Sequence, residues 1–160
     1  MVLRRYLNKP DTAGVIAPPP LLYLSGWLAG WLLSKLYPLP FLPVSLTWPL
    51  GGLLILSGVL CAAFAFRAMR RAHTHVDPYK PTTAIVVDGS YRYTRNPLYL
   101  ALTLFYVGLT SIVNSAWPLV LLPLVLLVMH HGVIVREERY LEQKFGAAYL
   151  QYKARVRRWL

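Results

Sequence analysis

Two short polar clusters hold the residues of this chain that are best suited to chemistry. The first, Gly89–Tyr99, reads Gly-Ser-Tyr-Arg-Tyr-Thr-Arg-Asn-Pro-Leu-Tyr, and the second, Arg136–Tyr140, reads Arg-Glu-Glu-Arg-Tyr. Each cluster lies at the edge of a long apolar segment. Ionised groups are costly next to hydrocarbon, and they tend to mark functional sites where they occur there. We therefore take the two clusters as the candidate site.

The first cluster fits a turn that leads into a helix. Gly89 suits a turn in which the backbone approaches a ligand closely. Asn96-Pro97 suits a helix start, because proline is tolerated in the first turn and disfavours helix for the residue before it. Arg95 and Tyr99 would then lie together at this helix end. A loop that only sets membrane topology, with arginines and tyrosines at the interface, explains the same residues.

Glu137 and Glu138 favour a binding site over a purely topological role. They follow an apolar segment directly, in a region that is otherwise rich in positive charge. Acidic residues contribute little to membrane topology, so topology does not explain the pair. They either form ion pairs with Arg136 or Arg139, worth about 0–1 kcal/mol if exposed, or bind a cationic or polyhydroxyl ligand.

The composition places both clusters in a membrane protein. Apolar residues make up 56% of the 160 residues and charged residues only 14%, whereas an average soluble domain has roughly 25% charged residues. The net charge is +11, but a nucleic-acid-binding chain of this size would be more hydrophilic. We therefore expect the lipid bilayer as the partner and no nucleic acid. Cys61 is the single cysteine, so no intrachain disulfide is possible.

Four apolar segments predict an all-α polytopic membrane protein that forms one domain over residues 1–160. The segments are 21–36, 48–66, 98–113 and 117–135. A helix needs about 20 residues to cross the hydrocarbon core, so the first and third segments are short. The proline-rich stretch 37–47 predicts a rigid connector without helix.

The distribution of basic residues predicts the orientation in the membrane. Every Lys and Arg except Lys35 falls in the N-terminal tail, the loop 67–96 or the tail from Arg136. Four spans place these three regions on one face, which the positive-inside rule makes cytoplasmic, together with both termini. The basic stretch Met1–Lys9 lacks the following apolar core and cleavage site of a signal peptide.

The C-terminal tail, 136–159, predicts an amphipathic cytoplasmic helix. Its large apolar residues recur at spacings of three and four, which places them on one helix face. They are Leu141, Phe145, Tyr149, Tyr152 and Val156. Such a helix either lies on anionic headgroups or folds over the ends of the spans and closes a site.

The histidines do not predict a metal site. His73 and His75 alternate before Asp77, and His130 and His131 lie near the end of the fourth apolar segment. Histidine is a common metal ligand, but histidines in a basic stretch beside a membrane are usually interfacial. Short motifs of this kind carry little weight alone.

The order of these elements resembles the isoprenylcysteine carboxyl methyltransferase family, which is related to the phospholipid methyltransferases. The resemblance rests on Gly-x-Tyr-Arg-x-x-Arg-Asn-Pro-x-Tyr at 89–99, Glu-Glu-x-x-Leu at 137–141, and Phe-Gly-x-x-Tyr-x-x-Tyr-x-x-x-Val at 145–156. It covers roughly residues 68–160, which would form the cofactor-binding part. One departure is Asn96, where the prenylcysteine enzymes more often have His. The short chain is similar to the small bacterial members.

This resemblance implies an integral membrane enzyme of the bacterial inner membrane that uses S-adenosylmethionine. The methyl acceptor would be a lipophilic or membrane-partitioning carboxylate, thiol or amine. Carried over residue by residue, the resemblance implies a cofactor site made of Gly89, Tyr91, Arg95, Pro97, Tyr99, His131, Glu137, Glu138, Tyr149 and Tyr152. It implies catalytic roles for Arg95, Asn96, His131 and Glu138. His131 or Glu138 would be the base if the acceptor carries a proton.

Two other functions fit part of the sequence. Sterol reductases look similar in their C-terminal part, and Arg155, Arg157 and Arg158 could hold the 2′-phosphate of NADPH. A non-catalytic membrane protein, whose motifs serve only topology, is the second alternative. The adjacent carboxylates of Glu137 and Glu138 suit a cationic cofactor better. The sequence gives no indication of the oligomeric state.

Overall fold

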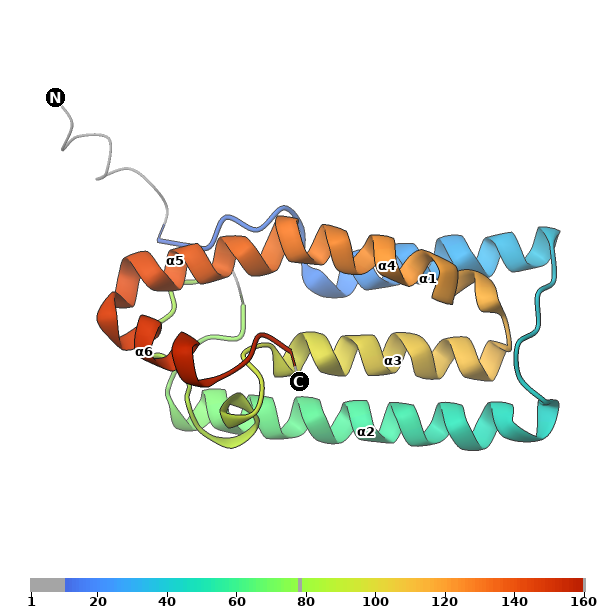
Figure 1. Cartoon of the computed structure of the whole chain (residues 1–160), viewed down its shortest axis with the longest axis horizontal. Coiled ribbons are helices and arrows are strands. Elements are labelled where there is room, and N and C mark those ends of the chain that lie inside the picture. Colours follow the sequence, from blue (N-terminus) through green and yellow to red (C-terminus); the bar gives the residue numbers. More distant parts are fainter. Residues whose placement is uncertain (1–10, 78, 160) are drawn as a thin grey trace, which may run out of the picture.

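The computed structural model describes residues 11–77 and 79–159, and every regular element among them is a helix (Figure 1). The predicted basic stretch Met1–Lys9 lies outside the described residues. The elements are α1 (Pro19–Leu36), α2 (Val44–Arg71), the short 3₁₀ helix η2 (Gly89–Arg92), α3 (Pro97–Val113), α4 (Ala116–Met129), the π-helical turn η3 (His130–Ile134), α5 (Val135–Phe145) and α6 (Ala147–Arg155). This confirms the all-α prediction for the described part of the chain.

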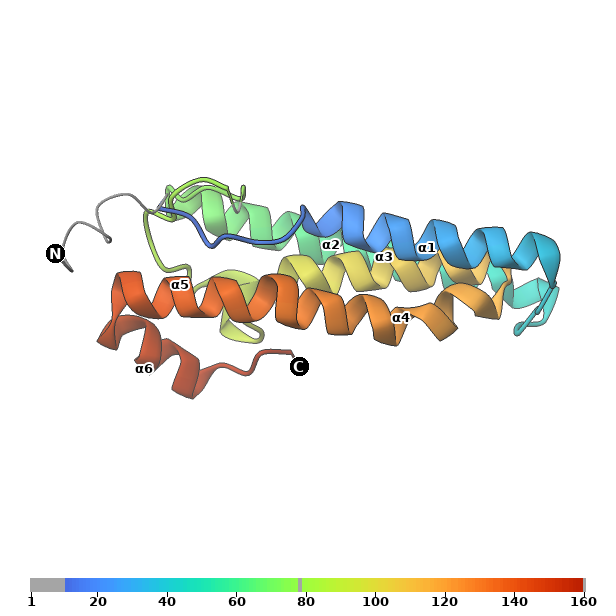
Figure 2. The ribbon, with the colours of Figure 1, turned by 90° about the horizontal axis from the view of Figure 1, so that it is seen from above.

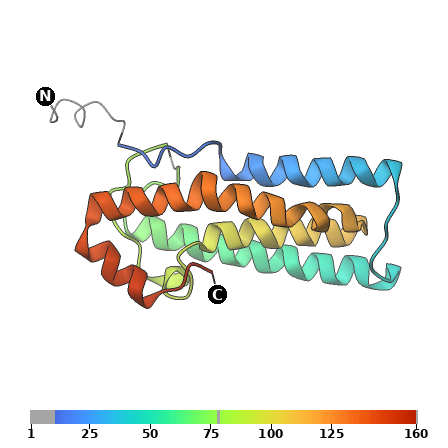
Figure 3. The ribbon, with the colours of Figure 1, turned by 45° about the horizontal axis from the view of Figure 1, so that its top comes forward.

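Long helices run side by side along the molecule, and the four predicted apolar segments lie within them (Figures 1 and 3). Two helices are long and apolar enough to cross a membrane, Val44–Arg71 and the continuous helix Ala116–Phe145. The apolar part of the second ends at Val135, and the polar residues from Arg136 onward extend beyond it. The helix α3 is equally apolar in character but shorter.

The connector between α1 and α2 is shorter than predicted. Residues 44–47 are helical, so the prediction of a non-helical stretch over 37–47 was wrong at its end. Pro43 directly precedes the first helical residue, a position where its fixed φ does not oppose helix. The Thr47 hydroxyl donates to the Val44 carbonyl at 2.8 Å, which stabilises the first turn.

The C-terminal tail forms two helices, so the prediction of one helix over 136–159 was wrong. The chain reverses at Gly146, whose φ of +54° lies in the region that favours glycine. The second helix, α6, therefore folds back toward the bundle (Figure 2). This reversal buries Tyr149 and Tyr152.

Asn114 closes the end of the bundle opposite the polar clusters. Its backbone adopts a left-handed conformation with φ +51°, which Asn tolerates better than most residues. Its side-chain oxygen accepts hydrogen bonds from the Phe41 and Leu42 amides, at 3.1 and 2.9 Å. Its amide nitrogen donates to the Leu42 carbonyl at 2.9 Å. The α1–α2 connector is thereby fixed to the α3–α4 turn.

Small residues let α2 and α3 approach closely. A Cβ atom at Gly51 would lie 2.8 Å from the Gly108 carbonyl oxygen, and one at Gly108 would lie 3.0 Å from that of Gly51. Gly58 has a similar position beside the Ala101 carbonyl oxygen, at 3.1 Å. Small residues at such interfaces allow the backbone contact on which helix packing in membranes depends.

We predict that Gly51→Ala destabilises the protein, whereas Gly52→Ala does not. A Cβ at Gly52 meets no atom within 4 Å, and Ala is favoured over Gly in a helix by about 1 kcal/mol. At Gly51 the same methyl group overpacks the α2–α3 interface, at a cost of about 1–3 kcal/mol. Thermal unfolding of both variants in detergent measures the difference. Equal melting temperatures would contradict the close α2–α3 packing.

Candidate functional site

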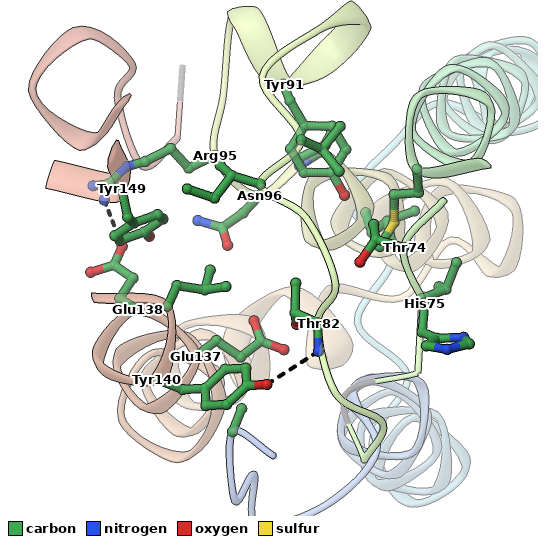
Figure 4. Close-up of a pocket in the computed structure, with 18 of the residues that line it drawn as sticks. Thr74, His75, Thr82, Tyr91, Arg95, Asn96, Glu137, Glu138, Tyr140 and Tyr149 are labelled. Carbon is green, nitrogen blue, oxygen red and sulfur yellow. Dashed lines mark hydrogen bonds and ion pairs between the residues drawn. The ribbon is translucent and has the colours of Figure 1, made fainter. Parts of the chain in front are cut away.

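The two polar clusters meet around one cavity at the end of the bundle (Figure 4). The cavity holds about 950 Å³ of space between atoms, part of it open to solvent. Its walls come from the loop between α2 and η2, the start of α3, α5 and α6. Nine of the predicted site residues line it: Tyr91, Arg95, Asn96, Pro97, Tyr99, Glu137, Glu138, Tyr149 and Tyr152.

Two predicted site residues do not line this cavity. His131 lies in the π-helical turn with an exposed side chain. Gly89 adopts φ +62° and turns the chain beside α2, where an added Cβ would lie 3.3 Å from the Ala68 Cβ. The structure therefore gives Gly89 a role at the start of η2, and it does not bring His131 to the other predicted residues.

Glu138 is enclosed by basic side chains from three segments. Arg158 donates to both of its carboxylate oxygens, at 2.9 and 2.7 Å. Arg95 Nη1 lies 3.1 Å from Oε1, and Lys153 Nζ lies 3.9 Å from Oε2. Burial by itself would raise the pKa of Glu138, but the Arg158 hydrogen bonds and these positive charges outweigh it and lower that pKa. Glu138 is therefore an ionised residue that joins α5, α6 and the C-terminal segment.

The Thr94–Asn96 stretch holds the C-terminal segment against the bundle. The Arg95 amide donates to the Arg157 carbonyl at 2.9 Å. The Thr94 hydroxyl and the Asn96 side-chain amide both donate to the Arg158 carbonyl, at 3.1 and 2.9 Å. Asn96 is thus engaged in positioning Arg158, and through it the pair with Glu138.

Arg95 keeps hydrogen-bonding capacity that no described residue uses. Its side chain is only 9% exposed. Nε has no hydrogen-bond partner in the described part of the chain, and Nη1 meets Glu138 only as an ion pair, outside hydrogen-bond geometry. Buried donors without partners are rare and call for an explanation. A ligand with an anionic group in this cavity would supply the missing acceptor.

Glu137, one residue before Glu138, has the opposite environment. Its carboxylate accepts a hydrogen bond from the Tyr99 hydroxyl at 2.6 Å, and no basic side chain of the described residues forms an ion pair with it. Burial raises the pKa of Glu137 to about 7, despite the Tyr99 hydrogen bond, and the neighbouring Glu138 charge adds to the effect. Figure 4 shows its carboxylate directed into the space between the walls. Glu137 can accept a proton or pair with a cation of a ligand.

Aromatic rings form one wall of the cavity. The Tyr149 and Tyr152 rings lie 6.1 Å apart, and the Tyr152 hydroxyl donates to the Tyr91 carbonyl at 2.8 Å. Burial raises the pKa of Tyr149 to about 12, so this phenol stays protonated at neutral pH. The faces of such rings attract cations.

Tyr140 closes the opposite side by joining two loops to α5. Its hydroxyl accepts from the Thr82 amide at 3.1 Å and from Lys144 Nζ at 3.0 Å, and it donates to Asp11 Oδ1 at 2.8 Å. Lys144 also forms an ion pair with Asp11 at 2.6 Å. The N-terminal segment and the loop after α2 are therefore fixed by the same hydroxyl group.

The π-helical turn gives the N-terminal segment its place along the continuous helix Ala116–Phe145. The Ile16 amide donates to the Gly132 carbonyl at 3.2 Å, and the Ile16 side chain occupies the space that a Gly132 side chain would need. Arg136 donates to the Gly14 carbonyl at 2.9 Å. Single π-helical turns inside α-helices are frequent at functional sites.

The loop after α2 lies within the predicted cofactor-binding part, 68–160, but sequence reasoning named none of its residues as site residues. The residues of this loop that line the cavity are Thr74, His75, Val76, Asp77, Thr82, Ala84, Ile85 and Val86. His75 and Asp77 were considered only as metal ligands, and the described residues contain no cluster of three or more ligating side chains. The loop has no helical or strand periodicity, so the sequence carried no signal for its position.

The arginines proposed for a nucleotide phosphate do not converge on the cavity. Arg155 and Arg157 are exposed, and neither lines the cavity. Arg158 is engaged by Glu138. The site that the described residues form instead is a partly open cavity with an aromatic wall, a carboxylate without an ion pair (Glu137) and an arginine whose Nε has no hydrogen-bond partner (Arg95).

Comparison with known proteins shows the family of this chain. A family model described as phospholipid methyltransferase matches residues 46–148, more than half of the chain. The chain therefore belongs to the phospholipid methyltransferase family. The matched region contains nearly all of α2, both polar clusters and the loop that lines the cavity.

Individual proteins match the chain at 28–40% identity over part of its length. An uncharacterised protein of Haemophilus influenzae is 40% identical over 63 residues, covering 39% of this chain and 100% of its own length. The protein-S-isoprenylcysteine O-methyltransferase of Saccharomyces cerevisiae is 28% identical over 109 residues, 67% of this chain and 46% of that protein. The one of Schizosaccharomyces pombe is 33% identical over 72 residues, 45% of this chain and 30% of that protein.

The chain therefore spans less than half the length of either yeast methyltransferase. No solved structure gives a significant match.

We predict that Glu138→Gln destabilises the fold strongly, whereas Glu142→Gln does not. Removing the Glu138 charge leaves Arg95 and Arg158 without their common partner, and breaking such a buried pair costs about 3–5 kcal/mol. Glu142 pairs with Lys153 at a more exposed position, where the loss is at most about 1 kcal/mol. Thermal unfolding in detergent compares the two. Equal destabilisation would contradict the structural role of Glu138.

We also predict a pH-dependent difference between wild type and Glu137→Gln. Because the Glu137 pKa is about 7 in the folded protein and about 4.5 when unfolded, the folded state holds the proton more tightly. The free energy of unfolding of wild type therefore falls as pH rises from about 4.5 to 7, by up to about 3 kcal/mol. The Gln variant lacks this loss. A stability difference that is constant from pH 4.5 to 8 would show that Glu137 titrates normally.

Proposed function

We propose that this chain is an integral membrane enzyme that catalyses methyl transfer from S-adenosylmethionine to a lipophilic acceptor. Four helices would cross the bacterial inner membrane, and the cavity would lie at its cytoplasmic face with both termini. The proposal rests on two groups that line the same cavity. Arg95 has a buried Nε without a hydrogen-bond partner among the described residues, and Glu137 forms no ion pair with any of them. Family membership supports methyl transfer as the reaction.

The residues present fit S-adenosylmethionine by charge. That molecule carries a carboxylate, an ammonium group and a sulfonium, and when bound it supplies an electrophilic methyl group. Arg95, with a free buried Nε, would hold the carboxylate, because guanidinium groups bind carboxylates in a fork. Glu137 would face the ammonium or the sulfonium. Tyr91 and Tyr149 would present ring faces to the positive charge.

The two adjacent carboxylates would have different roles in this proposal. Glu138 is already neutralised by Arg158 and Arg95, so it would position the site without touching the ligand. Glu137 would contact the ligand directly. If the acceptor is a thiol or an amine that carries a proton, Glu137 is also the group placed to receive that proton. His131, exposed and away from the cavity, would have no direct role.

The position of the cavity suits a polar donor and an apolar acceptor. Apolar side chains such as Met69, Leu98 and Ile134 line it beside the charged groups. Met69 belongs to α2 and Leu98 to α3, the two helices that pack most closely. A lipophilic acceptor would reach the cavity from the hydrocarbon, and the polar donor would reach it from the cytoplasm. Restricting both reactants to one orientation would supply much of the rate acceleration.

We predict that the detergent-purified protein binds S-adenosylmethionine with a dissociation constant on the order of micromolar, measured by isothermal titration calorimetry. Arg95→Gln and Glu137→Gln should each weaken binding at least about tenfold, which corresponds to about 1.4 kcal/mol. Arg92→Gln and Glu142→Gln are matched controls, because Arg92 is exposed and neither residue lines the cavity. Absence of binding by folded wild-type protein would overturn the proposed function.

S-adenosylhomocysteine separates the two possible partners of Glu137. It keeps the carboxylate and the ammonium group but has a neutral sulfur. If Glu137 faces the ammonium group, Glu137→Gln should reduce the affinity for both ligands equally. If it faces the sulfonium, the variant should reduce the affinity for S-adenosylmethionine alone. Unchanged affinity for both would exclude Glu137 from the ligand site.

A further inference from the structure

The outer face of α2 carries a continuous stripe that changes from apolar to basic. Leu60, Ala63, Phe64, Arg67, Arg70 and Arg71 follow one another at spacings of three, one, three, three and one residues. This spacing places all of them on one side of the helix. They line a groove on the surface, together with Phe66 and His73. Along this groove, the apolar residues lie toward the helix middle and the arginines toward its end.

Among the described residues, no other helix packs against this face of α2. The helix packs against α3 and η2, and Figures 1 and 3 show it at the edge of the bundle with its other side free. Phe64 is 55% exposed and Leu60 is 49% exposed. Among the described residues, no acidic side chain forms a salt bridge with Arg67, Arg70 or Arg71, although the same chain pairs Arg95, Lys144 and Arg158.

The axial position of the arginines matches the edge of a hydrocarbon layer. Trp48, which is 70% exposed near the other end of α2, is of the type that gathers at membrane interfaces. From Trp48 to Arg67 the helix rises about 28 Å at roughly 1.5 Å per residue. The hydrocarbon core of a bilayer is about 30 Å thick. With Trp48 at one interface, Arg67 therefore lies at the other, and Arg70 and Arg71 lie slightly beyond it.

We propose that this stripe is a binding site for one anionic phospholipid. The phosphate and any further headgroup charge would contact Arg67, Arg70 and Arg71, and an acyl chain would lie along Leu60 and Phe64. Guanidinium groups bind phosphate oxygens in pairs, and basic side chains at a cytoplasmic surface attract anionic lipid. A zwitterionic lipid brings a cationic group with its phosphate and so adds no net negative charge to offset the three arginines, and a free phosphate would leave the apolar half of the groove uncovered.

The lipid site is separate from the cavity that would bind the methyl donor. None of the stripe residues lines that cavity, although Met69 on another face of α2 does. The lipid would therefore be a bound neighbour of the enzyme and not its acceptor. The proposal does not rest on the proposed methyl transfer, and it would stand if the reaction were another.

The test measures thermal unfolding of the detergent-purified full chain with phosphatidylglycerol or phosphatidylcholine added, because a ligand of the folded state raises the melting temperature. We expect phosphatidylglycerol to stabilise the protein more than phosphatidylcholine with the same acyl chains. The triple variant Arg67→Gln, Arg70→Gln, Arg71→Gln should weaken the apparent affinity for phosphatidylglycerol at least about tenfold. All three side chains are exposed, so this variant should fold.

A charge-matched control variant distinguishes lipid binding at the stripe from a general effect of the protein's net charge. Arg92→Gln, Arg139→Gln and Arg155→Gln remove the same charge from exposed positions on other elements, and this variant should keep the wild-type response. Glycerol 3-phosphate at the same concentration should not stabilise the protein, and Phe64→Gln should weaken the lipid effect. Equal stabilisation by both lipids, equal loss in the control variant, or full stabilisation by glycerol 3-phosphate would each overturn the lipid site.

Discussion

The site depends on a buried carboxylate, Glu138, placed between Arg95 and Arg158. Taking such charges out of water is costly, and the cost is offset only when all partners are present with good geometry. Glu138 lies on α5, Arg95 precedes α3, and Arg158 lies beyond α6. These segments are far apart in sequence, and each is brought to the same end of the bundle by this contact and by the Asn96 side chain that holds the Arg158 carbonyl.

Adjacent residues on one helix thereby face different electrostatic environments. Positive charges outnumber negative charges around Glu138. The ion pairs there join three basic residues, Arg95, Arg158 and Lys153, to two acidic residues, Glu138 and Glu142. A short distance away, Glu137 has a tyrosine hydroxyl as its hydrogen-bond partner. The cavity thus contains a positive and a negative region of its own. A small zwitterionic ligand would be complementary to this arrangement.

The sequence predicted the helices and nine of the residues that line the cavity, because both depend on local patterns. The apolar segments are long, Asn96-Pro97 marks a helix start, and Glu137 and Glu138 stand out in a basic region. The separate roles of these two carboxylates were not predictable, because they depend on where Arg158 is placed by Thr94 and Asn96. The reversal at Gly146 was also missed, since the apolar spacing continues across it as if the helix were unbroken. The loop at Thr82 reaches the site through a single hydroxyl contact, which no periodicity reveals.

That contact, at Tyr140, has a consequence for exchange between the cavity and the cytoplasm. One phenol joins both the segment at Asp11 and the loop at Thr82 to α5. The two walls are therefore linked through Tyr140, although the N-terminal segment is also held by Lys144 at Asp11 and by Arg136 at Gly14. A ligand in the cavity would leave when these contacts open, so its residence time would respond to changes at Lys144, which does not itself line the cavity.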